Sequence, residues 1–124
     1  MLKVFSAIVI AAGLAAASLG TAHAQAKQDF ILENATGYPL RAVYVSPASS
    51  ESWDEDIMGN DIMPDGAVEE IAFSRDDTSC KWDLKVTFED DGSDAIWQGI
   101  DLCTVSRITI SYDRDSDKTM AKFD

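Results

Sequence analysis

The chain has 124 residues, in which 22 Asp and Glu outnumber 10 Lys and Arg, so its formal net charge is −12 at pH 7. Such a surface repels nucleic acid and anionic membranes, which excludes the function classes that bind polyanions. Hydrophobic residues make up 46% of the chain and include three Trp, more than a disordered acidic segment carries. We therefore expect one small folded domain.

The amino-terminal segment predicts a secretory signal peptide. Lys3 precedes an apolar run over residues 4–17, and small residues follow up to an Ala-x-Ala site that ends at Ala24. The run is shorter than the ~20 residues of a membrane span. We expect cleavage of residues 1–24 before Gln25, which leaves residues 25–124 as a single acidic β-sandwich domain, periplasmic or secreted, with no membrane attachment.

Cleavage would also limit the chemistry of the mature chain. It removes Lys3, no acidic residue and the only histidine, His23, so 9 Lys and Arg remain against 22 Asp and Glu, a net charge of −13. Without histidine, Ser-His or Cys-His activation and His-liganded zinc are impossible. Catalysis by a pair of carboxylates does not need histidine, but a small sandwich rarely forms a substrate cleft. We predict a protein that is not an enzyme and has no cofactor; a small carboxylate-dependent hydrolase is the alternative.

The mature chain predicts an all-β fold of about six strands. Apolar and polar residues alternate with period two in its clearest segment, where Trp82, Leu84 and Val86 are separated by Asp83 and Lys85. No segment shows helical periodicity over ten or more residues. We therefore expect an antiparallel sandwich or open barrel. Its predicted strands are residues 30–34, 40–46, 66–73, 82–88, 95–102 and 105–112.

An unusually long loop, residues 47–65, separates the second and third strands. Ser52-x-x-Glu55 resembles a capping box, which predicts one short helix or turn in this loop. One interpretation is a packed surface loop anchored by a tryptophan and surrounded by solvated acids. The other is an interaction loop for a basic protein partner or a cation, with contact residues Trp53, Asp54, Asp56 and Asp61.

Two cysteines predict one disulfide. An exported chain meets an oxidising compartment, and two cysteines allow a single intramolecular pairing. Asp91-Gly92 predicts a two-residue type I′ hairpin turn, about which opposed positions sum to 183 and Cys80 faces Cys103. By loop-closure entropy, a loop of ~24 residues contributes roughly 3 kcal/mol.

This hairpin register contains one conflict. Three apolar residues of the second strand would lie on the face opposite Trp82 and Leu84, namely Ile96, Ile100 and Leu102. A bulge near Gly99, or burial of both faces of the second strand, would resolve it.

Calcium requires several oxygen ligands on one bent segment, and three acidic segments approach that pattern without completing it. Residues 54–61 have no known ligand spacing, and residues 76–79 combine two acids with two hydroxyls. Asp113-x-Asp115-x-Asp117 begins like an EF-hand loop, but Lys118 replaces the glycine of its sharp turn. We expect no metal site, and a calcium-binding β domain is an alternative function. The polar tail from residue 113 onward is expected to fray.

Several strings resemble a family of small exported bacterial proteins of unknown function. They are residues 30–38, 44–49 and 64–66, Trp53, Cys80-x-Trp82 with the residues up to 86, and residues 100–103. Family members often carry the name argininosuccinate lyase, which the residues here do not support, because that enzyme is a large helical oligomer. The resemblance implies a secreted β domain with a disulfide, in which the framework positions are Trp53, Cys80, Trp82 and Cys103.

These observations together predict a monomeric, exported, soluble domain. Its function is expected to be that of a binding or interaction module that uses an acidic surface.

Overall fold

The computed structural model describes residues 26–124, so the predicted signal peptide and its cleavage site between Ala24 and Gln25 lie outside the described residues. Within this range the fold is all-β, with no helix and hence none able to cross a membrane. The strands are β1 (Phe30–Ala35), β2 (Leu40–Pro47), β3 (Val68–Ile71), β4 (Lys81–Phe88), β5 (Asp94–Asp101), β6 (Arg107–Asp113) and β7 (Lys118–Phe123).

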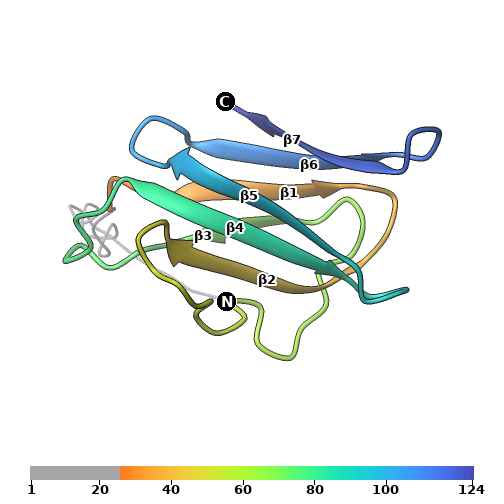
Figure 1. Ribbon diagram of the computed structural model, residues 1–124, viewed down its shortest axis with the longest axis horizontal. Coiled ribbons are helices and arrows are strands. Elements are labelled where there is room, and N and C mark those ends of the chain that lie inside the picture. The colour runs from red at the N-terminus through yellow and green to blue at the C-terminus, as the bar shows by residue number, and fades with distance from the viewer. Residues whose placement is uncertain (1–25) are drawn as a thin grey trace, which may run out of the picture.

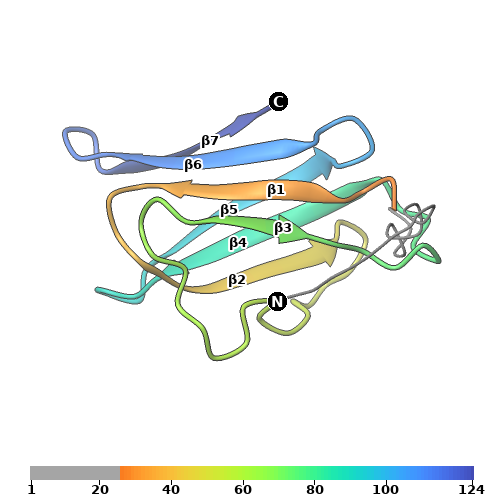
Figure 2. The same cartoon turned by 180° about the vertical axis from the view of Figure 1, so that it is seen from behind.

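The seven strands form two sheets that stack face to face, with the order β3-β1-β6-β7 in one and β2-β4-β5 in the other (Figures 1 and 2). The expected all-β sandwich with one disulfide is confirmed, and it is a sandwich rather than a barrel. One pair, β1 and β6, runs parallel. A parallel pair needs a long connection, and here the intervening chain supplies the whole second sheet.

The core lies between the sheets. Leu32, Ile108 and Ile110 project into it from one sheet, and Val43 and Val86 from the other, all with no exposed surface. Full burial of such a side chain stabilises the fold by about 1.5–3 kcal/mol. The alternation seen in the sequence therefore corresponds to the inner faces of the two sheets.

The carboxyl-terminal tail is ordered, so the expectation that it frays was wrong. β6 turns back into β7, and the two strands pair antiparallel from Asp113↔Lys118 to Ile108↔Phe123. Acidic side chains build the turn, because the carboxylate of Asp113 accepts hydrogen bonds from the Asp115 N–H and the Ser116 hydroxyl. The strand was missed because β7 is an edge strand with a weak apolar alternation.

The turn between β4 and β5 is longer than the predicted type I′ turn. That turn needs positive φ at both central residues, whereas only Gly92 has one, at 73°. The Gly92 N–H donates to the Phe88 carbonyl at 3.0 Å, and the Phe88 N–H donates to the Ser93 carbonyl at 2.8 Å. Asp91 stabilises the loop by accepting hydrogen bonds from the Ser93 N–H and hydroxyl.

A β-bulge at Gly99 resolves the conflict for Ile100 but not for Ile96, which lies opposite Lys85 on the outer face with 50% of its surface exposed. The register shifts between Trp82↔Ile100 and Leu84↔Trp97, and Gly99 has a φ of 68°. Trp82 and Ile100 therefore share the core face, with 5% and 7% of their surface exposed. Of the two solutions considered from the sequence, the bulge is the one that the structure adopts.

The disulfide closes the open end of this hairpin. Cys80 and Cys103 are bonded with a Cα–Cα distance of 5.2 Å. The Leu102 N–H donates to the Cys80 carbonyl at 2.8 Å, which continues the pairing beyond the bulge. The bond therefore holds the two strand ends together beyond the register shift.

Replacement of both cysteines by serine (Cys80→Ser with Cys103→Ser) is expected to lower the free energy of unfolding by roughly 3 kcal/mol, because the bond closes a loop of sequence separation 23. Urea unfolding followed by Trp fluorescence measures this. The free energies, rather than the midpoints, are to be compared, because the cross-link also changes the unfolded chain. An unchanged free energy of unfolding would contradict the proposed stabilising role of the disulfide.

Candidate functional site

The predicted interaction loop is folded back onto the outer face of the β2-β4-β5 sheet. Trp53 is half-buried, and its ring centroid lies 6.5 Å from that of Tyr44 on β2. The Lys85 ammonium lies 4.6 Å from the Tyr44 centroid and 5.1 Å from the Trp53 centroid. Such cation–π contacts contribute about 0.5–1 kcal/mol at exposed sites. Trp53 therefore anchors the loop to the sheet.

Asp56 holds the loop along the free edge of β2. Its Oδ1 accepts hydrogen bonds from the Val43 N–H at 2.9 Å and the Met58 N–H at 3.0 Å, and the Ile57 N–H donates to the Val43 carbonyl. These contacts cover part of an edge that would otherwise be open to other chains. The sequence predicted a short helix or a turn in this loop, and the structure has a turn over residues 57–60.

The other two acids among the predicted contact residues, Asp54 and Asp61, are exposed. The loop then returns to the core at Met63, which is fully buried and exchanges two backbone hydrogen bonds with Leu40. The four predicted contact residues thus divide into two anchors, Trp53 and Asp56, and two exposed acids. They do not surround a common cavity.

Replacement of Asp56 by alanine is expected to destabilise the protein by about 1–3 kcal/mol, because the buried Val43 N–H loses its acceptor. The matched change of the exposed Asp54 to alanine should stay within about 0.5 kcal/mol. Thermal and urea unfolding of both variants test this. Equal losses in the two variants would mean that Asp56 is not an anchor.

A different site forms where β1, β4 and β6 end at the same end of the sandwich (Figure 1). Tyr38 follows β1, Phe88 is the last residue of β4, and Tyr112 lies near the end of β6. Their ring centroids are 5.7–6.5 Å apart and each pair of rings meets edge to face. Segments that are distant in sequence thus build one aromatic cluster.

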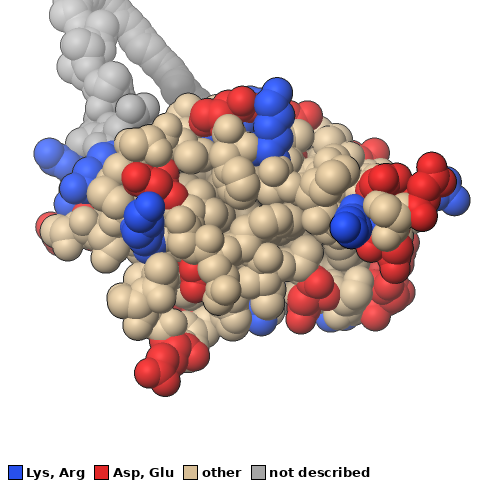
Figure 3. Space-filling view, turned by 45° about the horizontal axis from the view of Figure 1, so that its top comes forward, with Lys and Arg blue, Asp and Glu red and all other residues tan. Residues whose placement is uncertain are grey.

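Carboxylates surround this cluster. A cavity of about 410 Å³ is lined by the three aromatic residues, by Ser93 and Thr119, and by four acids, Asp90, Asp91, Asp94 and Asp117. Figure 3 shows acidic side chains gathered at this end of the molecule, on the right. We call this site the acidic–aromatic pocket.

Three of the four carboxylates of the pocket are held by hydrogen bonds and not by cations. Asp91 accepts from Ser93, Asp94 accepts from the Thr87 hydroxyl at 2.6 Å, and Asp117 accepts from the Tyr112 hydroxyl. Among residues 26–124 no Lys or Arg forms an ion pair with any of them. Arg41 lies beside the same hairpin loop. Its guanidinium Nη2 is 3.4 Å from the position that a Cβ atom would occupy at Gly92. The negative charge of the pocket is therefore not neutralised by a direct partner.

The hydrogen bonds also set the protonation states. The backbone N–H and the hydroxyl of Ser93 lower the pKa of Asp91, which keeps this carboxylate charged. The hydrogen bond from Tyr112 to Asp117, with some desolvation and the charge of Asp117, raises the pKa of the Tyr112 phenol. The pocket thus combines a charged rim with a phenol that stays neutral.

Tyr112 is expected to titrate above the ordinary tyrosine pKa of about 10. Because its pKa is raised on folding, the associated stability is fully present below pH ~10 and is lost as the pH rises through the folded value. Asp117→Asn should lower the pKa of the Tyr112 phenol, whereas Asp115→Asn in the same turn should leave this pKa unchanged. Ultraviolet difference titration measures both, and identical curves for the two variants would contradict the assignment.

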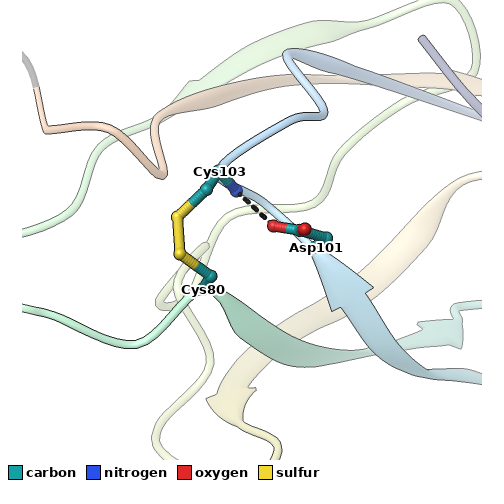
Figure 4. Close-up of side chains that lie close together, drawn as sticks. All are labelled: Cys80, Asp101 and Cys103. Carbon is teal, nitrogen blue, oxygen red and sulfur yellow. Dashed lines mark hydrogen bonds between the residues drawn. A yellow bond between two sulfur atoms is a disulfide. The ribbon is translucent and has the colours of Figure 1, made fainter.

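The three acids considered for calcium do not converge. Within the described chain, only Cys80, Asp101 and Cys103 place three potential ligand atoms within 4.8 Å of one another. Figure 4 shows that the two sulfurs of this group are joined in the disulfide and that Asp101 accepts a hydrogen bond from the Cys103 N–H at 3.1 Å. Asp113, Asp115 and Asp117 instead form a turn and a contact to Tyr112.

Comparisons of this chain with protein-family models, curated proteins and solved structures find no match. The resemblance to small exported proteins stays a prediction. The functional argument therefore depends on the geometry of the chain itself.

Sequence reasoning did not identify the acidic–aromatic pocket. A usable signal was present, because Phe88 and Tyr112 each stand directly before an acidic turn. The sequence did not reveal that these turns lie at the same end of two different sheets.

Proposed function

We propose that this protein is an exported, non-enzymatic binding module and that the acidic–aromatic pocket receives a cationic side chain of a basic protein partner. One observation carries this proposal: four carboxylates that form no ion pair with any Lys or Arg of residues 26–124 surround three aromatic rings in one cavity. The signal-peptide pattern and the disulfide support export.

An arginine side chain fits the chemistry of this pocket. Its guanidinium is planar and weakly hydrated, donates in pairs to carboxylates and stacks on aromatic rings. The pocket supplies both kinds of partner, in Asp90 and Asp94 and in Tyr38 and Tyr112. The net negative charge of the chain would also attract a basic protein before contact.

The same residues give less support to the hydrolase alternative. The residues that line the pocket are Tyr, Phe, Asp, Ser and Thr, without a Cys, Lys or His. A carboxylate pair needs one member that stays protonated to act as an acid, which requires a raised pKa. The pKa of Asp91 is lowered instead.

Isothermal titration calorimetry with a hexa-arginine peptide tests the proposal. The pocket variant changes the four acids to asparagine: Asp90→Asn, Asp91→Asn, Asp94→Asn and Asp117→Asn. The amide oxygens can still accept the hydrogen bonds that Asp91, Asp94 and Asp117 accept. We expect its affinity to fall by about tenfold, which corresponds to about 1.4 kcal/mol.

The control variant loses the same total charge at exposed sites elsewhere: Asp54→Asn, Asp61→Asn, Glu70→Gln and Asp76→Asn. It should bind nearly as well as the wild type, because charges that do not contact the peptide contribute mainly through screened attraction. If both variants bind the peptide equally weakly, the interaction depends only on net charge, and the pocket is not the binding site. A third variant, Tyr112→Leu, should also weaken binding, because it removes one of the rings.

A further inference from the structure

A second cavity lies between the loop that follows β2 and the outer face of the β2-β4-β5 sheet. It measures about 350 Å³. Its walls are Glu51, Trp53, Gln98 and three serines, at positions 46, 50 and 52, and Asp83 of β4 completes it. Apart from the indole of Trp53, these side chains carry oxygen atoms that can bind a cation.

Asp83 is the unusual member of this group. Only 9% of its surface is exposed, yet it carries a carboxylate on a central strand. The Gly99 N–H donates to its Oδ1 at 2.9 Å. No other hydrogen bond from residues 26–124 reaches this carboxylate, and no Lys or Arg of that range forms an ion pair with it. Burial of a carboxylate without a counter-charge is costly.

The nearest basic residue along the strand does not supply that charge. Lys85 lies two positions further on the same face of β4, but its ammonium lies over the rings of Tyr44 and Trp53. The free oxygen of Asp83 therefore lies in a cavity lined by hydroxyl, amide and carboxylate groups. The second oxygen of Asp83 is not one of the fully buried atoms that lack a hydrogen bond, so a cation that enters the cavity can reach it.

We infer that this cavity is a binding site for a hard divalent cation of the calcium type, with Asp83 as its buried ligand and Glu51 as its ligand from the loop. Calcium prefers oxygen ligands from carboxylates, carbonyls and water. The lining is almost entirely polar, which favours a hydrated ion over an alkylated ammonium group. Two carboxylates give a low ligand charge, as in extracellular calcium modules of weak affinity.

Such an ion would join the loop to the sheet, since Glu51 belongs to the loop and Asp83 to β4. The site is separate from the acidic–aromatic pocket and shares no lining residue with it. The inference therefore goes beyond the proposed function.

Terbium luminescence and thermal unfolding of the exported protein test the site. Terbium(III) replaces calcium as a probe, and Trp53 in the cavity wall would sensitise its emission. The wild type should show this emission, lose it on addition of millimolar calcium, and melt several degrees higher with calcium than without. Asp83→Asn should lose both signals. Its amide oxygen still accepts from Gly99, so without calcium it should melt at the wild-type temperature or above.

Two further variants separate the ion site from other effects. Asp61→Asn removes the same charge from an exposed position in the same loop and should keep both signals. Trp53→Phe should lose the emission but keep the calcium-dependent rise in melting temperature. Hexa-arginine binding should be unchanged by Asp83→Asn, so each site can fail without the other. Absence of both signals from the wild type, or their survival in Asp83→Asn, would overturn the inference.

Discussion

The hydrogen bond between Gly99 and Asp83 is the constraint on which the β4-β5 hairpin depends. It holds the extra residue of the bulge, and this residue returns Ile100 to the core face beside Trp82. Without this extra residue, every side chain of β5 beyond Trp97 would point to the opposite face of the sheet. The same contact gives one oxygen of the Asp83 carboxylate a hydrogen-bond donor in the middle of a strand. Local register, core packing and the candidate ion site therefore share one interaction.

The acidic residues of this chain have two distinct roles. Asp29, Asp56 and Asp113 accept backbone hydrogen bonds in loops and turns, so much of the apparent surface charge is structural. Asp83 and the acids of the acidic–aromatic pocket line cavities and have no cationic partner within the described chain. The functional proposals depend on this second group. A count of acidic residues alone cannot separate the two groups, because both are equally polar in sequence.

The sequence predicted those features that depend on neighbouring residues. The strong alternation around Trp82 identified β4, and the export pattern made the Cys80–Cys103 bond the expected pairing. It did not predict β7, the parallel β1-β6 pair or the acidic–aromatic pocket. Each of these depends on which strands become neighbours across long stretches of chain, and a weakly patterned edge strand such as Lys118–Phe123 carries little information about its partner. The bulge near Gly99 was one of two structures that the sequence allowed for the second strand of the hairpin, the other being burial of both its faces.

The two ends of the described chain lie together, away from the acidic–aromatic pocket. Gln28 donates to the carbonyls of Asp77 and Ser79 just before the disulfide, and Asp124 pairs with Arg107 at the start of β6. The pocket lies where β4 and β6 end, at the opposite end of the sandwich (Figure 1). A partner that binds the pocket would therefore approach the end of the sandwich that is remote from residues 26 and 124.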